Sequence, residues 1–385
     1  MSTQVPTPLY AKFPVPGIYP IDTEPEEPTP KKPEGGLMSK LDRLLGPWST
    51  TQRQPSPTPT SSATTNNPES APGAVESVPQ SEEPSDPTLL RILSWNIWFE
   101  RLFKEERTSA LIAIIKSLSP LPDVCCFQEC TSGFESQLLG DDWWMETWAM
   151  TKCKDQFAVT RSHYGTMVFV RRGLVGEMGF KARAWFEPFE TTQTGRGLLV
   201  LELTPPRSKH PVGGTNSPSS RNSLTLEPSI YQLLIGTSHL DYTPEIRAAQ
   251  FASSISTLSA APASVFCGDT NIDTYPELEP LLSAGYADSW LDTHPDFANS
   301  PNLREVGVTF GIAGLRQGGS PIGSEGPPRR LDYVMARGMK VKGCGLVGGE
   351  LIPREKWATA PEEQKLDFEV YVSDHLGVLA DVELA

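Results

Sequence analysis

The chain has 385 residues, with 33 lysines and arginines against 47 aspartates and glutamates, so its formal net charge is −14. This charge excludes a strongly basic surface that wraps nucleic acid, because the chain would on average repel a phosphate backbone. A local basic cleft, or an acidic site neutralised by a metal ion, remains compatible with it.

Proline separates the first 88 residues from the rest. Residues 1–88 hold 18 of the 37 prolines and are rich in serine and threonine. Such a composition cannot support a packed core, so we expect a disordered N-terminal arm. Leucines at helical spacing predict a short helix over residues 36–46, either a partner-binding helix or a transient one. The arm is therefore suited to binding protein partners.

Residues 89–385 are long enough to bury a large core, and we expect one globular catalytic domain. The N-terminus has no apolar signal region, and six cysteines without such a signal indicate free thiols in a reducing compartment. We expect an intracellular, unsecreted monomer of the nucleus, the cytoplasm or both, with no membrane segment. The clustered Cys125, Cys126 and Cys130 are expected to be core residues.

The domain begins with residues 89–98, a short apolar run typical of a buried strand, and residues 109–118 carry apolar side chains on one helical face. Many strands with few helices between them predict sheets packed face to face with helices outside. The long uncharged run at 248–268 predicts a helix and then a buried strand. The other predicted strands are 123–128, 166–171, 198–203, 231–238, 264–267, 331–336 and 378–382, and the predicted long loops are 204–228, 313–328 and 349–369.

Six polar clusters share one feature, which is that each lies where an apolar strand is expected to end. Strand ends are positions from which a rigid scaffold can direct side chains into one pocket. The clusters are Asn96 in LSWNIW, Glu129 in CFQEC, His239 in SHLD, Asp269 with Asn271 in GDTN, Asp332 in RLDY, and Asp374 with His375 in SDHLG.

Taken singly, these clusters have ordinary explanations. Asn96 could lie in a turn, Asp269 could make an Asx-turn, and His239 could be a hydrogen-bonded core histidine. Together they are hard to explain as packing, because buried charge is costly without a partner. We therefore expect them to satisfy one another and a cation. Oxygen ligands without a thiolate pair favour Mg²⁺, with Mn²⁺ as an alternative, over zinc.

The ordered series WN, QE, SHLD, GDTN, RLDY and SDHLG resembles the endonuclease/exonuclease/phosphatase superfamily across the whole domain. The resemblance implies metal-dependent phosphoesterase activity on an α/β fold. It further implies a four-layered α/β sandwich of two packed, mainly antiparallel sheets flanked by helices.

Carried over residue by residue, the resemblance implies that Glu129, Asn96 and Asp374 hold the metal. It implies that Asp269 orients and deprotonates the attacking water. The remaining implied roles are phosphate contact by Asn271 and His239, stabilisation of the transition-state charge by His375, and orientation of His375 by Asp332.

These roles agree with what the reaction requires. Phosphodiester hydrolysis needs a positioned water, neutralised non-bridging oxygens and relief of charge on the leaving oxygen. A carboxylate paired with His375 would raise the histidine pKa and favour the imidazolium. We therefore expect Asp269→Asn and His375→Ala each to remove activity while the fold stays intact.

Further positions resemble the tyrosyl-DNA phosphodiesterase 2 branch, whose members release a tyrosine from a DNA 5′ phosphate. They are GDTN, SHLD, Arg247 with Gln250, the TGRGL turn around Arg196, and Thr309 with Phe310. The resemblance implies that Phe310 forms an aromatic wall near the bound strand. It also implies a DNA 5′ end or a tyrosyl-DNA adduct as the phosphodiester substrate.

Two departures from this branch lie on the substrate side. Ile97-Trp98-Phe99 replaces an Ile-Asp-Gly sequence, and Asp273 replaces a basic residue. Trp98 and Phe99 either stack on a base or an aromatic leaving group, or pack as ordinary loop residues. Candidates for a basic phosphate track are Arg161, Arg171, Arg172, Arg196 and Arg329, of which Arg196 is the strongest.

The sequence thus predicts a Mg²⁺-dependent phosphodiesterase acting in DNA repair. A phosphatase or phosphodiesterase for a small-molecule or lipid phosphate is the alternative, favoured by the acidic charge and by Asp273. A third alternative is a catalytically inactive scaffold recruited through the arm, which the presence of Glu129, Asp269 and Asp374 disfavours.

Overall fold

The computed structural model of the chain describes residues 89–100, 103–150, 164–192, 194–206, 232–300, 306–311, 328–358 and 369–384. The expected arm, with its helix at 36–46, lies outside the described residues. So do Arg161 and most of the expected loops at 204–228 and 313–328.

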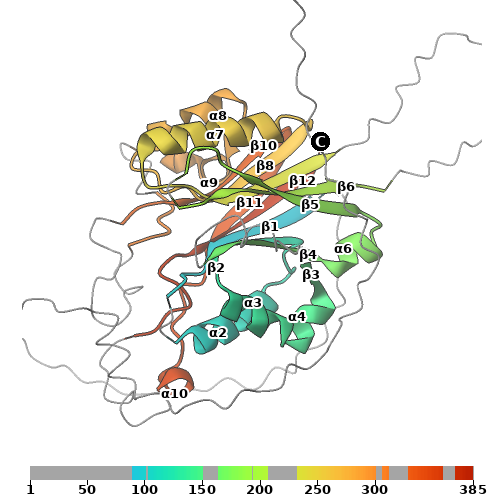
Figure 1. Cartoon of the computed structure of the whole chain (residues 1–385), viewed down its shortest axis with the longest axis vertical. Helices are drawn as coiled ribbons and strands as arrows, with labels where there is room; N and C mark the ends of the chain where they lie inside the picture. The colour runs from blue at the N-terminus through green and yellow to red at the C-terminus, as the bar shows by residue number, and fades with distance from the viewer. Residues whose placement is uncertain are drawn as a thin grey trace, which may run out of the picture. The chain divides into compact units, whose positions relative to one another are not determined.

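Within the described residues, the strands form two six-stranded sheets (Figure 1). Neighbouring strands run antiparallel except for β1 with β2 and β7 with β8, which run parallel. The first sheet is, in spatial order, β11 (Met339–Val347), β12 (Gly377–Leu384), β1 (Leu89–Asn96), β2 (Val124–Cys130), β4 (Gly165–Arg171) and β3 (Trp148–Met150). The second is β5 (Lys181–Pro188), β6 (Gly197–Thr204), β7 (Leu233–His239), β8 (Ala263–Asp269), β10 (Asp332–Arg337) and β9 (Ala287–Asp288).

Helices cover the outer faces of both sheets. Figure 1 shows α2, α3 and α4 on the outside of the first sheet and α7 and α8 on the outside of the second. The expected four-layered sandwich of mainly antiparallel sheets is therefore confirmed. The helices are α2 (Lys104–Ser117), α3 (Ser132–Leu139), α4 (Asp142–Thr147), α6 (Arg172–Gly176), α7 (Pro244–Leu258), α8 (Glu279–Ser283), α9 (Ser289–Thr293) and α10 (Arg354–Trp357), with short 3₁₀ turns η1 (Tyr275–Leu278) and η2 (Pro295–Phe297).

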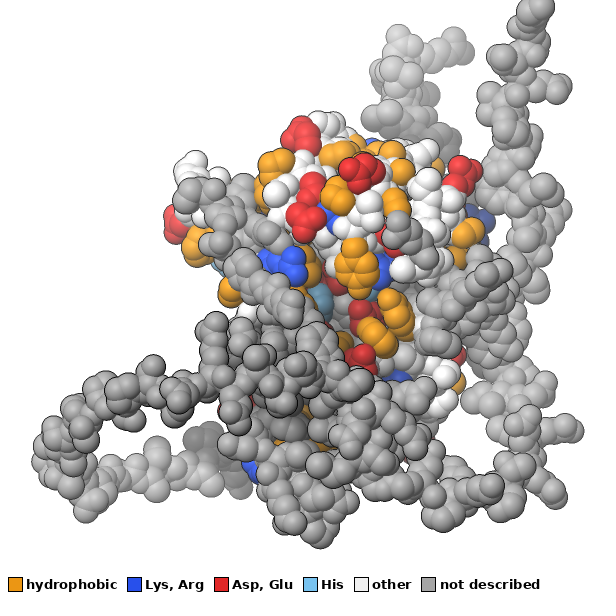
Figure 2. Space-filling model, turned by 60° about the vertical axis from the view of Figure 1, so that its left-hand side comes forward, with side chains coloured by type: hydrophobic (Ala, Val, Ile, Leu, Met, Phe, Trp, Pro, Cys, Tyr) orange, Lys and Arg blue, Asp and Glu red, His pale blue; other side chains and the backbone are white. Residues whose placement is uncertain are grey.

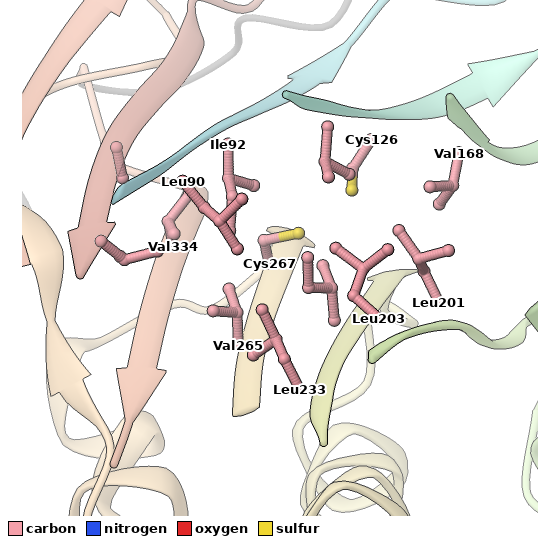
Figure 3. Packing of buried hydrophobic residues seen from close by; sticks show 14 of the residues in the cluster. Leu90, Ile92, Cys126, Val168, Leu201, Leu203, Leu233, Val265, Cys267 and Val334 are labelled. Atoms are coloured by element: carbon pink, nitrogen blue, oxygen red, sulfur yellow. The ribbon is translucent and has the colours of Figure 1, made fainter. Parts of the chain in front are cut away.

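Three hydrophobic clusters correspond to the three spaces between the four layers. One lies between the sheets, where side chains from both point toward one another (Figure 3). The other two lie beneath α2–α4 and beneath α7 and α8. Side chains along β1 alternate between its two faces, and both faces are buried. Leu90 and Ile92 belong to the inter-sheet cluster, whereas Leu93 and Trp95 belong to the cluster beneath the helices.

The same alternation explains the adjacent cysteines. Cys126 faces the other sheet and Cys125 and Cys130 face the helices, all with no exposed surface. The expectation that they are core residues is confirmed, and no described cysteine forms a disulfide.

Strands β5 and β11 were not predicted. Each lies at one end of its sheet, and their polar or glycine residues hide the apolar pattern of a buried strand. Among the described helices, none is long and apolar enough to cross a membrane.

Candidate active site

The sheet topology brings the six polar clusters to one edge of the sandwich. Asn96 ends β1 opposite Gln128 of the parallel strand β2, and His239 ends β7 opposite Asp269 of the parallel strand β8. Strand β10 runs antiparallel to β8, so Asp332 begins it opposite Asp269. Strand β12 runs antiparallel to β1, which returns the preceding segment to the same edge.

Asp269 lies at the centre of the cluster and is 2 % exposed. Its Oδ2 accepts a hydrogen bond from Nδ2 of Asn96 at 2.9 Å. The same oxygen lies 3.4 Å from Nε2 of His239 and 3.8 Å from Nε2 of His375. Burial alone would raise the pKa of Asp269, but the charge of His375 and the hydrogen bonds from Asn96 and from the backbone amide of Asn271 hold it below its usual value. Asp269 is therefore ionised and can accept a proton.

The backbone on either side of Asp269 has special geometry. Gly268 has φ of 135°, and a Cβ there would lie 1.9 Å from the carbonyl oxygen of Ser238, so a side chain cannot be accommodated. Asn271 has φ of 51°, a left-handed conformation that asparagine tolerates. Its Nδ2 donates to the carbonyl oxygen of Leu240 at 2.7 Å. These constraints fix the GDTN turn.

His375 is oriented by Asp332. The two side chains are hydrogen-bonded between Nδ1 and Oδ2 at 2.7 Å. Burial alone would lower the pKa of His375, but the charge and hydrogen bond of Asp332 raise it well above its usual value. The backbone amide of Asp332 donates to Oγ1 of Thr309 at 3.2 Å, which fixes the start of β10. His375 is therefore an imidazolium at neutral pH.

Phe310 packs against this histidine. Its ring centroid lies 4.7 Å from that of His375, and the side chain is 7 % exposed. The guanidinium carbon of Arg329 lies 5.4 Å from the centre of the Phe310 ring. Phe310 is thus packing support for His375, and little of its ring is left open as a wall for a strand.

Glu129 lies where β2 departs from regular pairing with β4, and its φ is 61°. Its Oε2 accepts the backbone amide of Phe99 at 2.8 Å, and its Oε1 lies 3.7 Å from Nδ1 of His239. Burial raises the pKa of Glu129 to about 7, and the nearby charge of Asp374 acts in the same direction. Burial also raises the pKa of Asp374.

The residues present fit a hard divalent cation. Glu129 and Asp374 are two carboxylates with raised pKa values, which a nearby cation would lower, and an amide oxygen suits the same ion. It stays a prediction that the metal ligands are Asn96, Glu129 and Asp374. A second group among the described residues, Asp269, Asp332 and His375, has ligand atoms within 4.8 Å of one another. In that group, however, Asp332 and His375 already bind each other.

Arg196 lies beside Asn271 of the candidate site, and its role as a substrate contact stays a prediction. It donates from Nη1 to the carbonyl oxygen of Leu240, which also receives the amide of Asn271. Its Nη2 donates to the hydroxyl of Tyr164 at 3.3 Å. Its buried Nε has no hydrogen-bond partner among the described residues. Burial and the charge of Arg196 lower the pKa of His239 to about 3, so this histidine is neutral.

A buried carboxylate holds the turn that carries Arg196. Asp241 accepts hydrogen bonds from the hydroxyls of Thr192 and Thr194 at 2.7 and 2.8 Å and from Nε2 of Gln250 at 2.6 Å. The Thr192 hydroxyl in turn accepts the backbone amide of Arg196 at 3.0 Å. The SHLD and TGRGL motifs are therefore one connected unit.

Trp98 and Phe99 have different environments. Trp98 is 6 % exposed and lies beneath the guanidinium of Arg107, 4.4 Å from the ring centre, so it packs as a loop residue. Phe99 is 37 % exposed and stacks on Tyr164 at 4.8 Å. Arg107 and Tyr164 were missed in the sequence, because Arg107 lies within a helix and Tyr164 only precedes a strand.

Two of the proposed basic residues lie elsewhere. Arg171 pairs with Asp123 at 2.5 Å, at the opposite end of β2 from Glu129. Arg172 donates to the carbonyl oxygen of Met145 at 2.8 Å. The expectation that Arg171 and Arg172 belong to a phosphate track is wrong, because both stabilise the far end of the first sheet.

The two-sheet sandwich with its acid–histidine cluster defines a hydrolase of phosphoric esters. Residues 93–375 match the Endonuclease/Exonuclease/phosphatase family, and the chain belongs to that family. The chain also resembles D. rerio TDP2 in complex with a single-strand DNA product, with a TM-score of 0.53, 20 % identity, and coverage of 77 % of this chain and 99 % of that one. Truncated Caenorhabditis elegans TDP2 is similar, with a TM-score of 0.50, 20 % identity, and coverage of 77 % and 97 %. At these identities the likeness concerns the fold, and comparison with curated proteins returned no match.

Proposed function

We propose that the chain is a Mg²⁺-dependent phosphodiesterase that hydrolyses its substrate by direct attack of water. The observation that carries this proposal is the position of Asp269 between two histidines in different protonation states. His239 is neutral, since its pKa is about 3, whereas the pKa of His375 is raised well above its usual value. The ionised Asp269 thus lies beside the neutral His239 and the positively charged His375, as acid–base chemistry on a phosphate requires.

In this mechanism Asp269 accepts a proton from water while the water oxygen forms a bond to phosphorus. The bond from phosphorus to the leaving oxygen breaks with its electron pair on that oxygen, which takes up a proton from solvent water. His375 donates from Nε2 to a non-bridging oxygen, and Asp332 keeps the histidine charged and oriented. Neutral His239 and the amide of Asn271 contact the other phosphate oxygens, with Arg196 beside them.

The metal would be held by Glu129, Asp374 and Asn96. When bound, Mg²⁺ would neutralise charge on the phosphate and on the leaving oxygen. The raised pKa of Glu129, about 7, supports a cation beside it. Burial disfavours the ionised carboxylate, and a nearby positive charge would stabilise it. Mn²⁺ would fit the same oxygen ligands.

We propose a DNA 5′ end, in particular a 5′-tyrosyl adduct, as the substrate. The cation Arg196 beside the proposed phosphate contacts supports a bound phosphodiester. The likeness in fold to a TDP2 that was crystallised with single-strand DNA is compatible with this substrate class. An activity of this kind would be intracellular, in the nucleus or the cytoplasm, and the free thiols of the described cysteines support that compartment.

A small-molecule or lipid phosphate is the second candidate. Asp273 stands where the branch has a basic residue, and its Oδ2 accepts from Nη2 of the buried Arg247 at 3.0 Å. The buried charge of Arg247 is thereby committed to Asp273 and to Glu277. This position therefore offers no cation to a DNA strand, which favours a smaller substrate.

The experiment compares a 5′-tyrosyl oligonucleotide with bis-p-nitrophenyl phosphate, each with Mg²⁺ and with a chelator. We expect Mg²⁺-dependent release of tyrosine, leaving a 5′ phosphate, and loss of this activity in Asp269→Asn. If only bis-p-nitrophenyl phosphate is hydrolysed, the proposed DNA substrate is wrong and the small-molecule or lipid phosphate becomes the substrate class. Absence of hydrolysis of both substrates would overturn the proposed function and favour an inactive scaffold.

A further inference from the structure

Two exposed aromatic rings flank the candidate active site. Among the residues that the structure describes, five large hydrophobic side chains are exposed, and two of these are Phe99 and Tyr242. Phe99 stacks on Tyr164 with 4.8 Å between ring centroids, and Tyr164 lies 6.2 Å from His239 in a nearly parallel orientation. Tyr242 stands edge-on to His239 at 6.5 Å. We call Phe99, Tyr164 and Tyr242 the aromatic rim.

The rim lies beside the polar groups of the site, because the rings of Tyr164 and Tyr242 both lie against that of His239. Figure 2 shows a face on which red acidic and orange hydrophobic side chains gather around pale blue histidine, with blue basic groups beside them. Exposed apolar surface that is bordered by polar groups can mark a ligand-binding site. The rim is therefore a candidate contact surface for part of a substrate.

The backbone that carries Phe99 is fixed from below. Nη2 of the buried Arg107 donates to the carbonyl oxygen of Trp98 at 2.6 Å and to that of Ile97 at 3.3 Å. The amide of Phe99 itself donates to Glu129 at 2.8 Å. Because Trp98 has φ of 58° and is buried, the chain turns so that the next side chain, Phe99, lies outside.

The backbone that carries Tyr242 is fixed as well. The preceding amide, of Asp241, donates to Oε1 of Gln250 at 2.9 Å, and the carbonyl oxygen of Tyr242 accepts from Nη1 of Arg247. The guanidinium carbon of Arg196 lies 5.0 Å from the centre of the Tyr242 ring. Tyr242 is nevertheless 62 % exposed, so much of its ring is open to solvent.

Rigid exposed rings are effective binding groups. A ring whose backbone is already fixed loses little conformational entropy when a ligand covers it, and the covered apolar area then favours binding. Stacking of a base on an aromatic side chain contributes about 1 to 3 kcal/mol. The ligand that fits such a surface is a flat, uncharged ring attached close to a phosphate.

We propose that the aromatic rim is a stacking subsite for a planar ring of the substrate, next to the phosphate that is hydrolysed. The ring is either a nucleobase or an aromatic group esterified to the phosphate, and both share the chemistry that the rim recognises. This inference rests on the proposed function only for the position of the phosphate. The open faces of Phe99 and Tyr242 determine substrate preference in place of a basic group at Asp273.

The test measures binding, not turnover, on the full chain with Mg²⁺ by titration calorimetry. Three ligands are compared. Thymidine 5′-monophosphate carries a nucleobase, phenyl phosphate carries an aromatic ring esterified to the phosphate, and methyl phosphate carries no ring. We expect at least one of the two ring-bearing esters to bind about tenfold more tightly than methyl phosphate. The ester that shows the advantage identifies the source of the ring.

In Phe99→Ala and Tyr242→Ala this advantage should fall to about threefold or less, while the affinity for methyl phosphate stays unchanged. Tyr242→Phe keeps the ring and should keep the advantage. Phe297→Ala removes an exposed ring whose described contact is with His294, and it should leave all three affinities unchanged. Equal binding of the three esters, no measurable binding of any, or an advantage that survives both alanine substitutions together would overturn the proposal. Failure of the proposed function would instead appear as intact binding without hydrolysis.

Discussion

Nδ1 of His375 lies 2.7 Å from Oδ2 of Asp332, and neither residue is more than 5 % exposed. Because burial alone would lower the pKa of His375, the charge of Asp332 is what keeps the histidine protonated. In Asp332→Asn the pKa of His375 should therefore fall. We expect kcat/KM at neutral pH to drop about a hundredfold, and the alkaline limb of its pH profile to move to lower pH. Steady-state rates between pH 5 and 9 check this.

A matched control is Asp381→Asn, which removes a carboxylate paired with Arg91 at 2.6 Å, away from the end of β1 that carries Asn96. It should leave the shape of the pH profile unchanged. An unmoved alkaline limb in Asp332→Asn would contradict the role of Asp332 as the group that holds the charge on His375.

Metal binding should appear in stability, because a ligand that binds only the folded state raises the free energy of unfolding. At a hundredfold excess over its Kd, Mg²⁺ should add about 2.7 kcal/mol. Glu129→Gln should lose this increase without loss of metal-free stability, since it removes a buried acid whose pKa is raised to about 7. Thermal unfolding with and without Mg²⁺ measures both effects.

Glu146→Gln is the matched control for this measurement, because Glu146 is exposed at the end of α4. It should keep the full Mg²⁺-dependent increase. If Glu129→Gln also keeps it, the ion is held elsewhere, and the group of Asp269, Asp332 and His375 becomes the alternative site.

Part of this site could be predicted because Asn96, Glu129, His239 and Asp269 lie at the ends of apolar runs. An apolar run shows where a strand ends, and a strand end is a position from which side chains can enter one pocket, whereas Asp332 and His375 precede or begin their strands, β12 for His375 and β10 for Asp332. Asn96 and Asp269 illustrate this, since they end different strands of different sheets and still form a hydrogen bond of 2.9 Å. The interiors of β1 and β8 could be predicted for the same reason.

The remainder could not be predicted because it depends on contacts between distant segments. Arg107 reads as an ordinary helical arginine, and only the fold shows its donation to the carbonyl oxygens of Ile97 and Trp98. The difference between buried Trp98 and exposed Phe99 depends on one positive φ angle, which no pattern of residue types reveals. The end strands β5 and β11 lack a fully buried face, so their sequences carry a weak signal.

Acid should weaken the turn that carries Arg196. Burial alone would raise the pKa of Asp241, but hydrogen bonds from Thr192, Thr194 and Gln250 hold it below its usual value of 3.8. A lowered pKa in the folded state stabilises the fold above the unfolded pKa, and this contribution is lost as the pH falls through the folded value. At pH 7, the free energy of unfolding of Asp241→Asn should therefore be about 2 kcal/mol lower than that of the wild type.

Urea unfolding at pH 7, 5 and 3 measures this contribution. The difference between wild type and Asp241→Asn should be constant from pH 7 to 5 and smaller at pH 3. Asp296→Asn, at an exposed position in η2, serves as the control and should change stability little at any of these pH values. A difference that is the same at all three pH values would contradict the hydrogen-bonded carboxylate as its origin.

Gly268 should be irreplaceable for the fold, and with it the position of Asp269. Its φ is 135°, and a Cβ would lie 1.9 Å from the carbonyl oxygen of Ser238 in the neighbouring strand. Gly268→Ala should therefore lower the free energy of unfolding by more than about 3 kcal/mol, because the strand pair must separate. Gly345→Ala is the matched control, since a Cβ there meets no atom within 4 Å, and it should change stability by less than about 1 kcal/mol. Urea unfolding measures the free energy of unfolding of both variants. Similar values for Gly268→Ala and Gly345→Ala would contradict the prediction, because the contact between β7 and β8 could then relax.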